Sequence, residues 1–229
     1  MNATSTALQT VWRDVLTDSY RALETVVAGV GADQWHLPTP CSEWDVTQVV
    51  QHAAGDQLAF AEFLGIGAGP AYNPFAPSGA IDGTASELVR EAVEQTSVAW
   101  ATVDDATETV PTPLPHGALA TPVAAVMCAL DAAVHAWDIA VATGQPSPLT
   151  DELAGHLLTA ARAIHSAPGS GEAAEIVEPL RQWGAYAAIV DGPADSTAVA
   201  ALLRYLGREP RARVPVGGLA GAPPRPGPA

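Results

Sequence analysis

The sequence predicts an all-α protein, a four-helix bundle followed by a small C-terminal extension. Apolar residues recur at helical spacing in four long segments. Two long Gly/Pro-rich crossings separate these segments, and no alternating pattern typical of strands stands out. With 229 residues, 48% of them hydrophobic, the chain holds enough apolar material for the core of one ordinary domain. Long helices joined by long crossings are typical of helical bundles.

The first two helices are predicted on either side of a Pro-containing loop. The first spans Thr6 to Val30, where most apolar positions from Leu8 onward lie on one side. The loop "ADQWHLPTPCSEW" follows. The second helix spans Val46 to Leu64, and Asp45 before it is of the residue types that cap helix N-termini.

The third and fourth helices follow the two crossings. "GIGAGPAYNPFAPSGAIDG" leads to the third helix, Ala85 to Val103. "TETVPTPLPHGALATP" leads to the fourth, Val123 to Thr143, which Gly144 closes because glycine readily adopts the left-handed conformation found at helix ends.

Two shorter helices are predicted in the C-terminal part, Thr150 to His165 and Ser196 to Leu206. Between them "AYAAIV" reads equally well as a short strand or a helix end.

We therefore divide the chain into three parts. Residues 1–166 form the helical bundle, residues 167–210 a small extension, and residues 211–229 a disordered tail. The tail, rich in Pro and Gly, cannot bury enough surface to order itself.

The charge balance excludes several classes of partner. The net charge is −15, from 25 acidic and 10 basic residues, and all the basic residues are Arg. Such a chain has no basic stripe to neutralise phosphates, so we expect neither nucleic acid nor an anionic membrane surface as a partner. No signal peptide or long apolar run is evident, so we expect a cytoplasmic protein with free thiols. A homodimer is left open.

Ionisable residues interrupt the apolar fourth helix. At 100° per residue, Asp131, His135 and Asp138 all lie within or beside its apolar sector. Asp131 and His135 are four residues apart, so their side chains lie one turn apart on the same face.

The second helix repeats this pattern with His52 and Asp56, again four residues apart and within the apolar sector. Metal sites in bundles are built from such side chains on facing helices. A buried Asp–His hydrogen-bond network without metal explains the same pattern, because unpaired buried ionisable groups are costly. The residues alone leave both readings open.

Other reactive or charged residues are interpreted as structural. Cys41 has no basic neighbour in the local sequence to activate its thiol, so a catalytic role is not expected. Arg13, Arg21 and Arg90 lie on bundle helices, where surface ion pairs are favoured over contacts with an anionic substrate.

Three segments of the chain resemble a known family. "TPCSEWDVTQVVQHAAG" and "LDAAVHAWDIAVATGQ" are similar to the two motifs of the mycothiol-dependent maleylpyruvate isomerase N-terminal family, a branch of the DinB-like superfamily. "VDGPADSTAVAALLRYLGREP" resembles the way many actinobacterial members end. The resemblance implies a DinB-like four-helix bundle.

The resemblance also implies a metal site. Members of the family bind the metal with one His, one carboxylate and a second His, and the corresponding positions in this sequence are His52, Asp131 and His135. Asp131 stands where the family has Glu and is one methylene shorter, so it must approach the metal more closely or act through water. Asp56 and Asp138 are then alternative ligands or partners that orient the imidazoles. Such donors favour Zn²⁺, and also suit Ni²⁺ or Fe²⁺.

The resulting functional hypothesis is a metal-dependent enzyme acting on a small-molecule substrate, a thiol-assisted isomerase or transferase with mycothiol as the thiol cofactor. Two alternatives remain: a metal-free bundle that binds a small ligand, and a cyclase or isomerase of secondary metabolism that reuses the same pocket. No catalytic residue is assigned beyond the metal ligands.

Overall fold

A computed structural model describes residues 3–166, 173–193 and 197–212. Its elements, in chain order, are α1 (Ala3–Leu8), α2 (Trp12–Ala28), α3 (Val46–Phe63), α4 (Ala85–Ala101), β1 (Thr109–Val110), β2 (Leu119–Ala120), α5 (Thr121–Thr143), α6 (Asp151–Ala161), β3 (Ile164–Ser166), β4 (Ala173–Glu175), α7 (Val177–Trp183) and α8 (Ala198–Tyr205). The predicted all-α class is confirmed, and the strands among the described residues form two small antiparallel pairs, β1 with β2 and β3 with β4.

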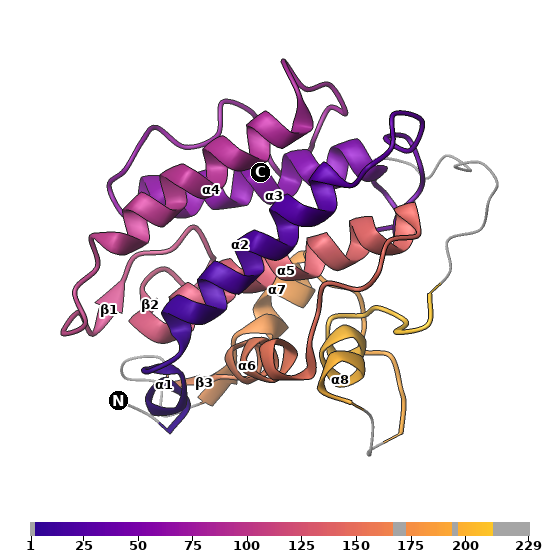
Figure 1. The fold of residues 1–229 in the computed structure, drawn as a ribbon. Helices are drawn as coiled ribbons and strands as arrows, with labels where there is room; N and C mark the ends of the chain where they lie inside the picture. The colour runs from indigo at the N-terminus through magenta and orange to yellow at the C-terminus, as the bar shows by residue number, and fades with distance from the viewer. Residues whose placement is uncertain (1–2, 167–172, 194–196, 213–229) are drawn as a thin grey trace.

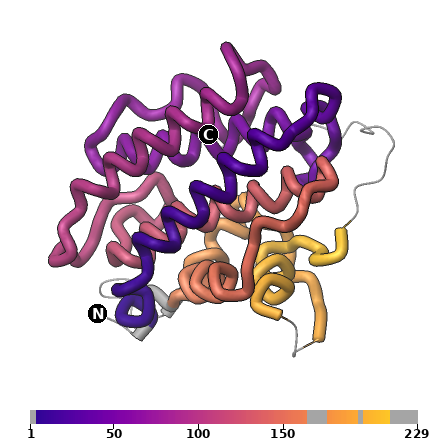
Figure 2. The backbone as a smooth tube through the Cα atoms, viewed as in Figure 1, coloured from indigo at the N-terminus to yellow at the C-terminus, as the bar shows by residue number. Residues whose placement is uncertain are grey.

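The four long helices α2, α3, α4 and α5 form the bundle (Figure 1). Helix α5 packs against α2 and α3, and α4 packs against α3 and α2. On its other side α5 contacts α6, which in turn packs against α8. The tube drawing shows the C-terminal elements, in orange and yellow, gathered along one side of the bundle (Figure 2). Helix α5 is therefore shared between the bundle and the C-terminal elements.

Two helix ends match the sequence reasoning. Asp45 caps α3: its carboxylate accepts a hydrogen bond from the Gln48 backbone N–H, and the Gln48 side chain accepts one from the Asp45 N–H. Gly144 ends α5 with a φ of 71°, in the left-handed region that glycine adopts without steric cost. These local signals thus set where α3 begins and where α5 ends.

The single first helix predicted by the sequence is divided into α1 and α2. The chain turns between them, and the Val11 N–H donates to the Leu8 carbonyl at 3.1 Å. Helix α1 packs against α5 and α6, whereas α2 packs against α5 and α4. Leu8 and Trp12, on either side of the turn, are both buried. The turn lets α1 and α2 pack against different helices, which one straight helix would not do.

The C-terminal part departs most from expectation. Helix α6 ends at Ala161, short of the predicted His165, and the β3–β4 pair follows. The "AYAAIV" segment, residues 185–190, is neither strand nor helix. The predicted boundary after residue 166 falls between β3 and β4. Most of the predicted disordered tail, residues 213–229, lies outside the described residues.

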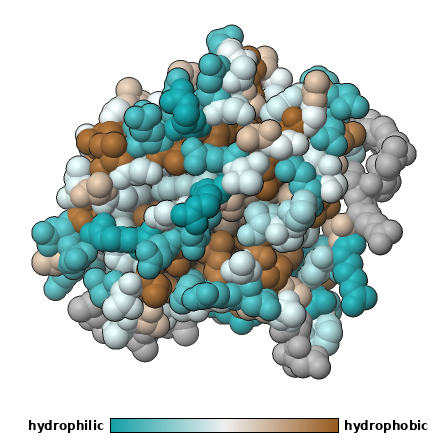
Figure 3. All heavy atoms as spheres, viewed as in Figure 1, coloured by the Kyte–Doolittle hydropathy of each residue, from teal (hydrophilic) through white to brown (hydrophobic). Residues whose placement is uncertain are grey.

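Helix α5 is the most enclosed element. By length and composition it is the one helix of the described ranges that would suffice to cross a membrane, but its apolar segment is buried by the rest of the protein. The core helix of a protein can have the same length and apolar composition, so these two properties of α5 are weak evidence for a membrane span. On the face shown in Figure 3, hydrophilic and hydrophobic residues are interspersed in small areas.

Candidate metal centre

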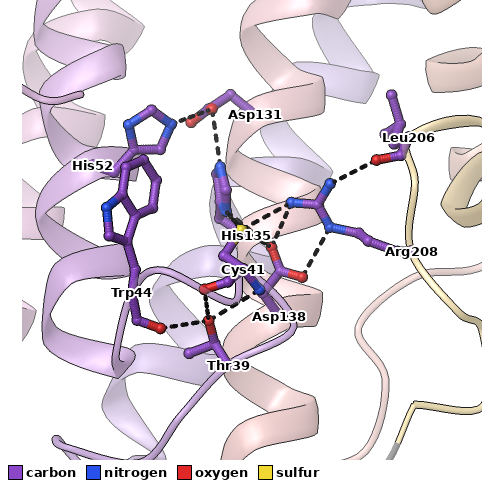
Figure 4. Close-up of polar contacts among 9 residues, drawn as sticks. All are labelled: Thr39, Cys41, Trp44, His52, Asp131, His135, Asp138, Leu206 and Arg208. Atoms are coloured by element: carbon purple, nitrogen blue, oxygen red, sulfur yellow. Dashed lines mark hydrogen bonds and ion pairs between the residues drawn. The ribbon is translucent and has the colours of Figure 1, made fainter. Parts of the chain in front are cut away.

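Three side chains from two facing helices meet inside the bundle. His52 projects from α3, and Asp131 and His135 project from α5 (Figure 4). Asp131 Oδ1 lies 3.3 Å from His52 Nε2 and 3.4 Å from His135 Nε2. The ligand atoms of the three residues all lie within 4.8 Å of one another. The structure therefore brings together the three residues that the sequence predicted as metal ligands.

The second nitrogen of each imidazole is already engaged. His52 Nδ1 lies 2.8 Å from the Pro74 carbonyl oxygen, and His135 Nδ1 lies 3.0 Å from Asp138 Oδ2. Both partners are acceptors, so each Nδ1 carries the hydrogen and donates it. In a neutral ring each Nε2 is then unprotonated and has a free lone pair. The Nε2 atoms of His52 and His135 both face the Asp131 carboxylate. Three acceptor groups converge, an arrangement that needs a cation or added protons.

Electrostatics reinforce this arrangement at Asp131. Burial alone opposes its ionisation, but the neighbouring His135 and His52 outweigh burial and hold the pKa of Asp131 below its usual range. Burial likewise opposes the charging of His135, yet Asp131 above all raises the pKa of His135 well above its ordinary value. The carboxylate is thus anionic. Its second oxygen, Oδ2, is buried without a hydrogen-bond partner among the described residues.

The donor set fits a divalent metal ion. Two imidazole nitrogens and a carboxylate are common ligands of Zn²⁺, and an unpartnered carboxylate oxygen provides a further donor. For tetrahedral zinc with bonds of 2.0–2.1 Å, adjacent ligand atoms lie about 3.3 Å apart. The distances of 3.3 and 3.4 Å from Asp131 Oδ1 match that spacing. Three protein ligands leave a position for substrate or water.

Asp138 lies behind His135, in the orienting position that the sequence reasoning proposed for it. Its carboxylate is fully buried and also receives two hydrogen bonds from Arg208, Nε to Oδ1 at 2.9 Å and Nη2 to Oδ2 at 2.7 Å. Burial raises the pKa of Asp138, but Arg208 and then His135 outweigh it and lower the pKa to about 2. Asp138 is therefore ionised and accepts from both neighbours.

Cys41 lies beside a basic residue that its local sequence does not contain. Its Sγ lies 3.2 Å from Arg208 Nη2, 3.4 Å from Asp138 Oδ2 and 3.9 Å from His135 Nδ1. The expectation concerned only the local sequence, and Arg208 is 167 residues away in sequence, so only folding brings the two together. Cys41, His135 and Asp138 form a second group of potential metal ligands. The Arg208 guanidinium already provides the positive charge there.

Asp56 lies one turn after His52 on α3 and is buried. It is not part of either converging ligand group, and no hydrogen bond joins it to the described residues. Burial, and then the charge of Asp131, raise the pKa of Asp56 well above its ordinary value, while His135 opposes this. Asp56 is thus a buried neighbour of the three convergent side chains that lies outside their ligand set.

Comparison with known proteins identifies the family. The mycothiol maleylpyruvate isomerase N-terminal domain matches residues 16–140, more than half of the chain. The chain belongs to this family. It is also 34% identical, over 143 residues, to uncharacterized proteins from two strains of Mycobacterium tuberculosis, CDC 1551 / Oshkosh and ATCC 25618 / H37Rv. That match covers 62% of this chain and 73% of each relative. No solved structure matches.

The mostly helical fold agrees with membership in the mycothiol maleylpyruvate isomerase N-terminal domain family, a mycothiol-related family of DinB-like bundles in which metal binding is typical. Cys41, His52, Asp131, His135 and Asp138 all lie within the matched range, 16–140. Arg208 lies outside it. The residue that the sequence reasoning missed therefore comes from the C-terminal segment. The one signal for it was the "YLGREP" ending that resembles other members.

Aromatic rings hold His52 in place. The Trp44 ring centroid lies 4.6 Å from that of His52, and the Phe75 centroid lies 5.4 Å away. Phe75 in turn contacts Trp183 of α7 at 4.7 Å, and both of these rings are partly exposed. Trp44 therefore packs directly on a candidate ligand.

The three arginines on bundle helices lie in surface ion pairs, as expected. Arg13 pairs with Asp105 at 2.7 Å, Arg21 pairs with Asp18 at 2.8 Å, and Arg90 lies near two glutamates of α4. None of them belongs to the converging ligand groups.

Proposed function

We propose that this protein is a metal-dependent enzyme that acts on a small molecule with the help of a thiol, as an isomerase or transferase, with His52, Asp131 and His135 holding the metal. One observation carries the proposal: two imidazole Nε2 atoms and a carboxylate converge while both Nδ1 atoms donate elsewhere. Family membership supports the thiol part, with mycothiol as the cofactor.

The chemistry follows from the donor set. A divalent ion bound by His52, Asp131 and His135, with Zn²⁺ the favoured metal, would supply positive charge. That charge would lower the pKa of a bound thiol and polarise a carbonyl oxygen. The protein orients His52 through the Pro74 carbonyl and His135 through Asp138. Because the side chains of His52, Asp131 and His135 are 8%, 12% and 9% exposed, the site admits a small molecule rather than a macromolecule.

Burial favours the protonated form of the Asp56 carboxyl, which lies one turn along α3 from His52. We assign it the role of a hydrogen-bond donor toward a bound ligand, a role that a carboxylate would not fill. The aromatic rings of Trp44 and Phe75 restrict the motion of His52 and line its apolar side.

Metal content is the deciding measurement. Protein purified without a histidine tag is expected to carry close to one equivalent of zinc, nickel or iron by mass spectrometry. His135→Ala should lose it, and His36→Ala, a change at an exposed histidine paired with Asp45, should keep it. Absence of metal in the unaltered protein, even after incubation with Zn²⁺ or Ni²⁺, contradicts the proposal and favours a metal-free ligand-binding bundle.

A positive result leads to activity assays. Isomerase and thiol-transfer assays with mycothiol are expected to show turnover that a chelator abolishes and added metal restores. Turnover that persists without any thiol would instead favour an isomerase or cyclase that reuses the same pocket.

A further inference from the structure

Arg208 reaches the interior of the protein from the end of the described C-terminal segment. Helix α8 ends at Tyr205, and the Arg208 backbone N–H donates to the Leu203 carbonyl at 2.8 Å. Gly207 has a φ of 80°, and a Cβ there would lie 2.6 Å from the Ala187 Cβ and 2.9 Å from backbone atoms of Ala187. Only glycine fits this turn, which directs the next side chain inward; Arg208 is 8% exposed.

Arg208 holds Asp138 through a two-point contact. Nε and Nη2 bond to the two carboxylate oxygens at 2.9 and 2.7 Å, the parallel arrangement that a planar guanidinium forms with a carboxylate (Figure 4). Nη1 donates to the Leu206 carbonyl at 3.3 Å, and Nη2 also lies 3.2 Å from Cys41 Sγ. Every side of the guanidinium is thus engaged, which fixes the Asp138 carboxylate in one orientation.

Asp138 passes this constraint to His135. The same oxygen, Oδ2, contacts both Arg208 Nη2 at 2.7 Å and His135 Nδ1 at 3.0 Å. A hydrogen bond at Nδ1 sets the rotation of the ring and directs Nε2 toward Asp131, 3.4 Å away. His52 obtains the same constraint from a backbone carbonyl, whereas His135 depends on a charged side chain that itself needs a partner.

We propose that Arg208 is a positioning residue of the metal site, which acts through Asp138 to orient His135. This inference rests on the proposed metal site and deepens it. It makes the segment after α8, outside the range that matches the family, a part of the site. A bundle without this segment would keep all three ligands and hold one of them loosely.

The test compares metal affinities of full-length variants by competition with a chromogenic zinc chelator. Arg208→Met should raise the zinc dissociation constant roughly 10- to 100-fold, the usual effect of removing the partner of a ligating histidine. Arg208→Lys keeps the charge but not the two-point contact, so a smaller rise is expected. The visible spectrum of the Co²⁺-loaded variants should also change, which a purely structural role would not cause.

Arg181→Gln is the matched control. Arg181 also belongs to the C-terminal elements and donates to the Tyr205 carbonyl at 2.9 Å, but it does not contact the site. Its variant should bind zinc within about twofold of the unaltered protein. An equal loss in this control would show that docking of the C-terminal elements, and not Arg208 itself, sets the affinity, and would overturn the inference.

Two further outcomes separate the inference from the proposed function. If the unaltered protein binds no metal, the proposed function fails and the inference falls with it. If the unaltered protein binds zinc and the Arg208 variants bind it equally well, only the inference fails. Should Arg208→Met not fold because Asp138 is left as an unpaired buried charge, the double variant Asp138→Asn with Arg208→Met removes both charges and is expected to show the same weakened binding.

Discussion

Asp131 Oδ1 lies 3.3 Å from His52 Nε2, although the two residues come from different helices. The facing nitrogen and oxygen are both acceptors once His52 Nδ1 has donated to Pro74, so this contact favours a shared cation. The same oxygen stands 3.4 Å from His135 Nε2, and the partnerless Oδ2 belongs to the same carboxylate. The function proposed for the protein depends on this one side chain.

Replacing Asp131 with Asn tests its charge. At a free zinc concentration 100 times the dissociation constant, binding stabilises the unaltered fold by about 2.7 kcal/mol. For a chain of this size that corresponds to a rise in Tm of roughly 5–10 °C. Asp131→Asn should abolish most of this rise in a thermal melt, because a neutral amide is a poor zinc ligand. Asp105→Asn, at the exposed partner of Arg13, should leave it unchanged. A full rise in Asp131→Asn would mean that zinc binds elsewhere.

Gly55→Ala should weaken metal binding without unfolding the protein. A Cβ at Gly55 would lie 2.7 Å from the Pro74 Cβ, so the loop that supplies the acceptor for His52 Nδ1 must shift. We expect the zinc dissociation constant to rise several-fold, measured by chelator competition.

The matched control for Gly55→Ala is Gly155→Ala on α6. A Cβ at Gly155 meets nothing within 4 Å, so this variant should gain up to about 1 kcal/mol of stability from helix propensity and bind zinc normally. Unchanged zinc affinity in Gly55→Ala would show that the Pro74 contact does not orient His52.

The two thiols should differ in reactivity. Cys128 is fully buried, its Sγ donates to Gln57 Oε1 at 3.1 Å, and burial raises its pKa to about 12. Cys41 is only partly buried. Titration with a thiol reagent at pH 8 should modify one cysteine in the native protein and the second only after denaturation. In Cys41→Ser the native protein should no longer react with the reagent. Rapid modification of both thiols in the native unaltered protein would contradict the buried setting of Cys128.

Tyr72 should contribute stability that is lost at high pH. Its hydroxyl donates to the Gln51 carbonyl at 2.7 Å, and burial raises its pKa to about 12. Because the folded pKa is raised above the unfolded value of about 10, the contribution is complete below pH 10 and is lost as the pH rises through 12. Tyr72→Phe should cost about 1 kcal/mol at neutral pH, in proportion to one hydrogen bond.

The measurement for Tyr72 is the free energy of unfolding, from denaturant titrations between pH 8 and pH 12. The difference between the unaltered protein and Tyr72→Phe should shrink across the upper part of that range. The chain contains no lysine, so lysine titration does not complicate the comparison. A difference that stays constant up to pH 12 would contradict the raised pKa of Tyr72.

The sequence by itself determined the class of fold and the three convergent side chains. Helical periodicity, Asp45 before α3 and Gly144 after α5 are local signals that need no knowledge of distant contacts. The inward direction of His52, Asp131 and His135 follows from the same periodicity, because four-residue spacing places side chains on one face.

Only the tertiary structure decided how these residues are held. Arg208, Cys41 and Asp138 lie far apart in the chain, so nothing in the local pattern of any one of them reveals the buried Arg208–Asp138 ion pair or the contact of Arg208 with Cys41. The division between α1 and α2, and the form of residues 185–190, likewise depend on packing against distant helices. Local periodicity encodes which way a side chain points, whereas its partner depends on how separate segments pack together.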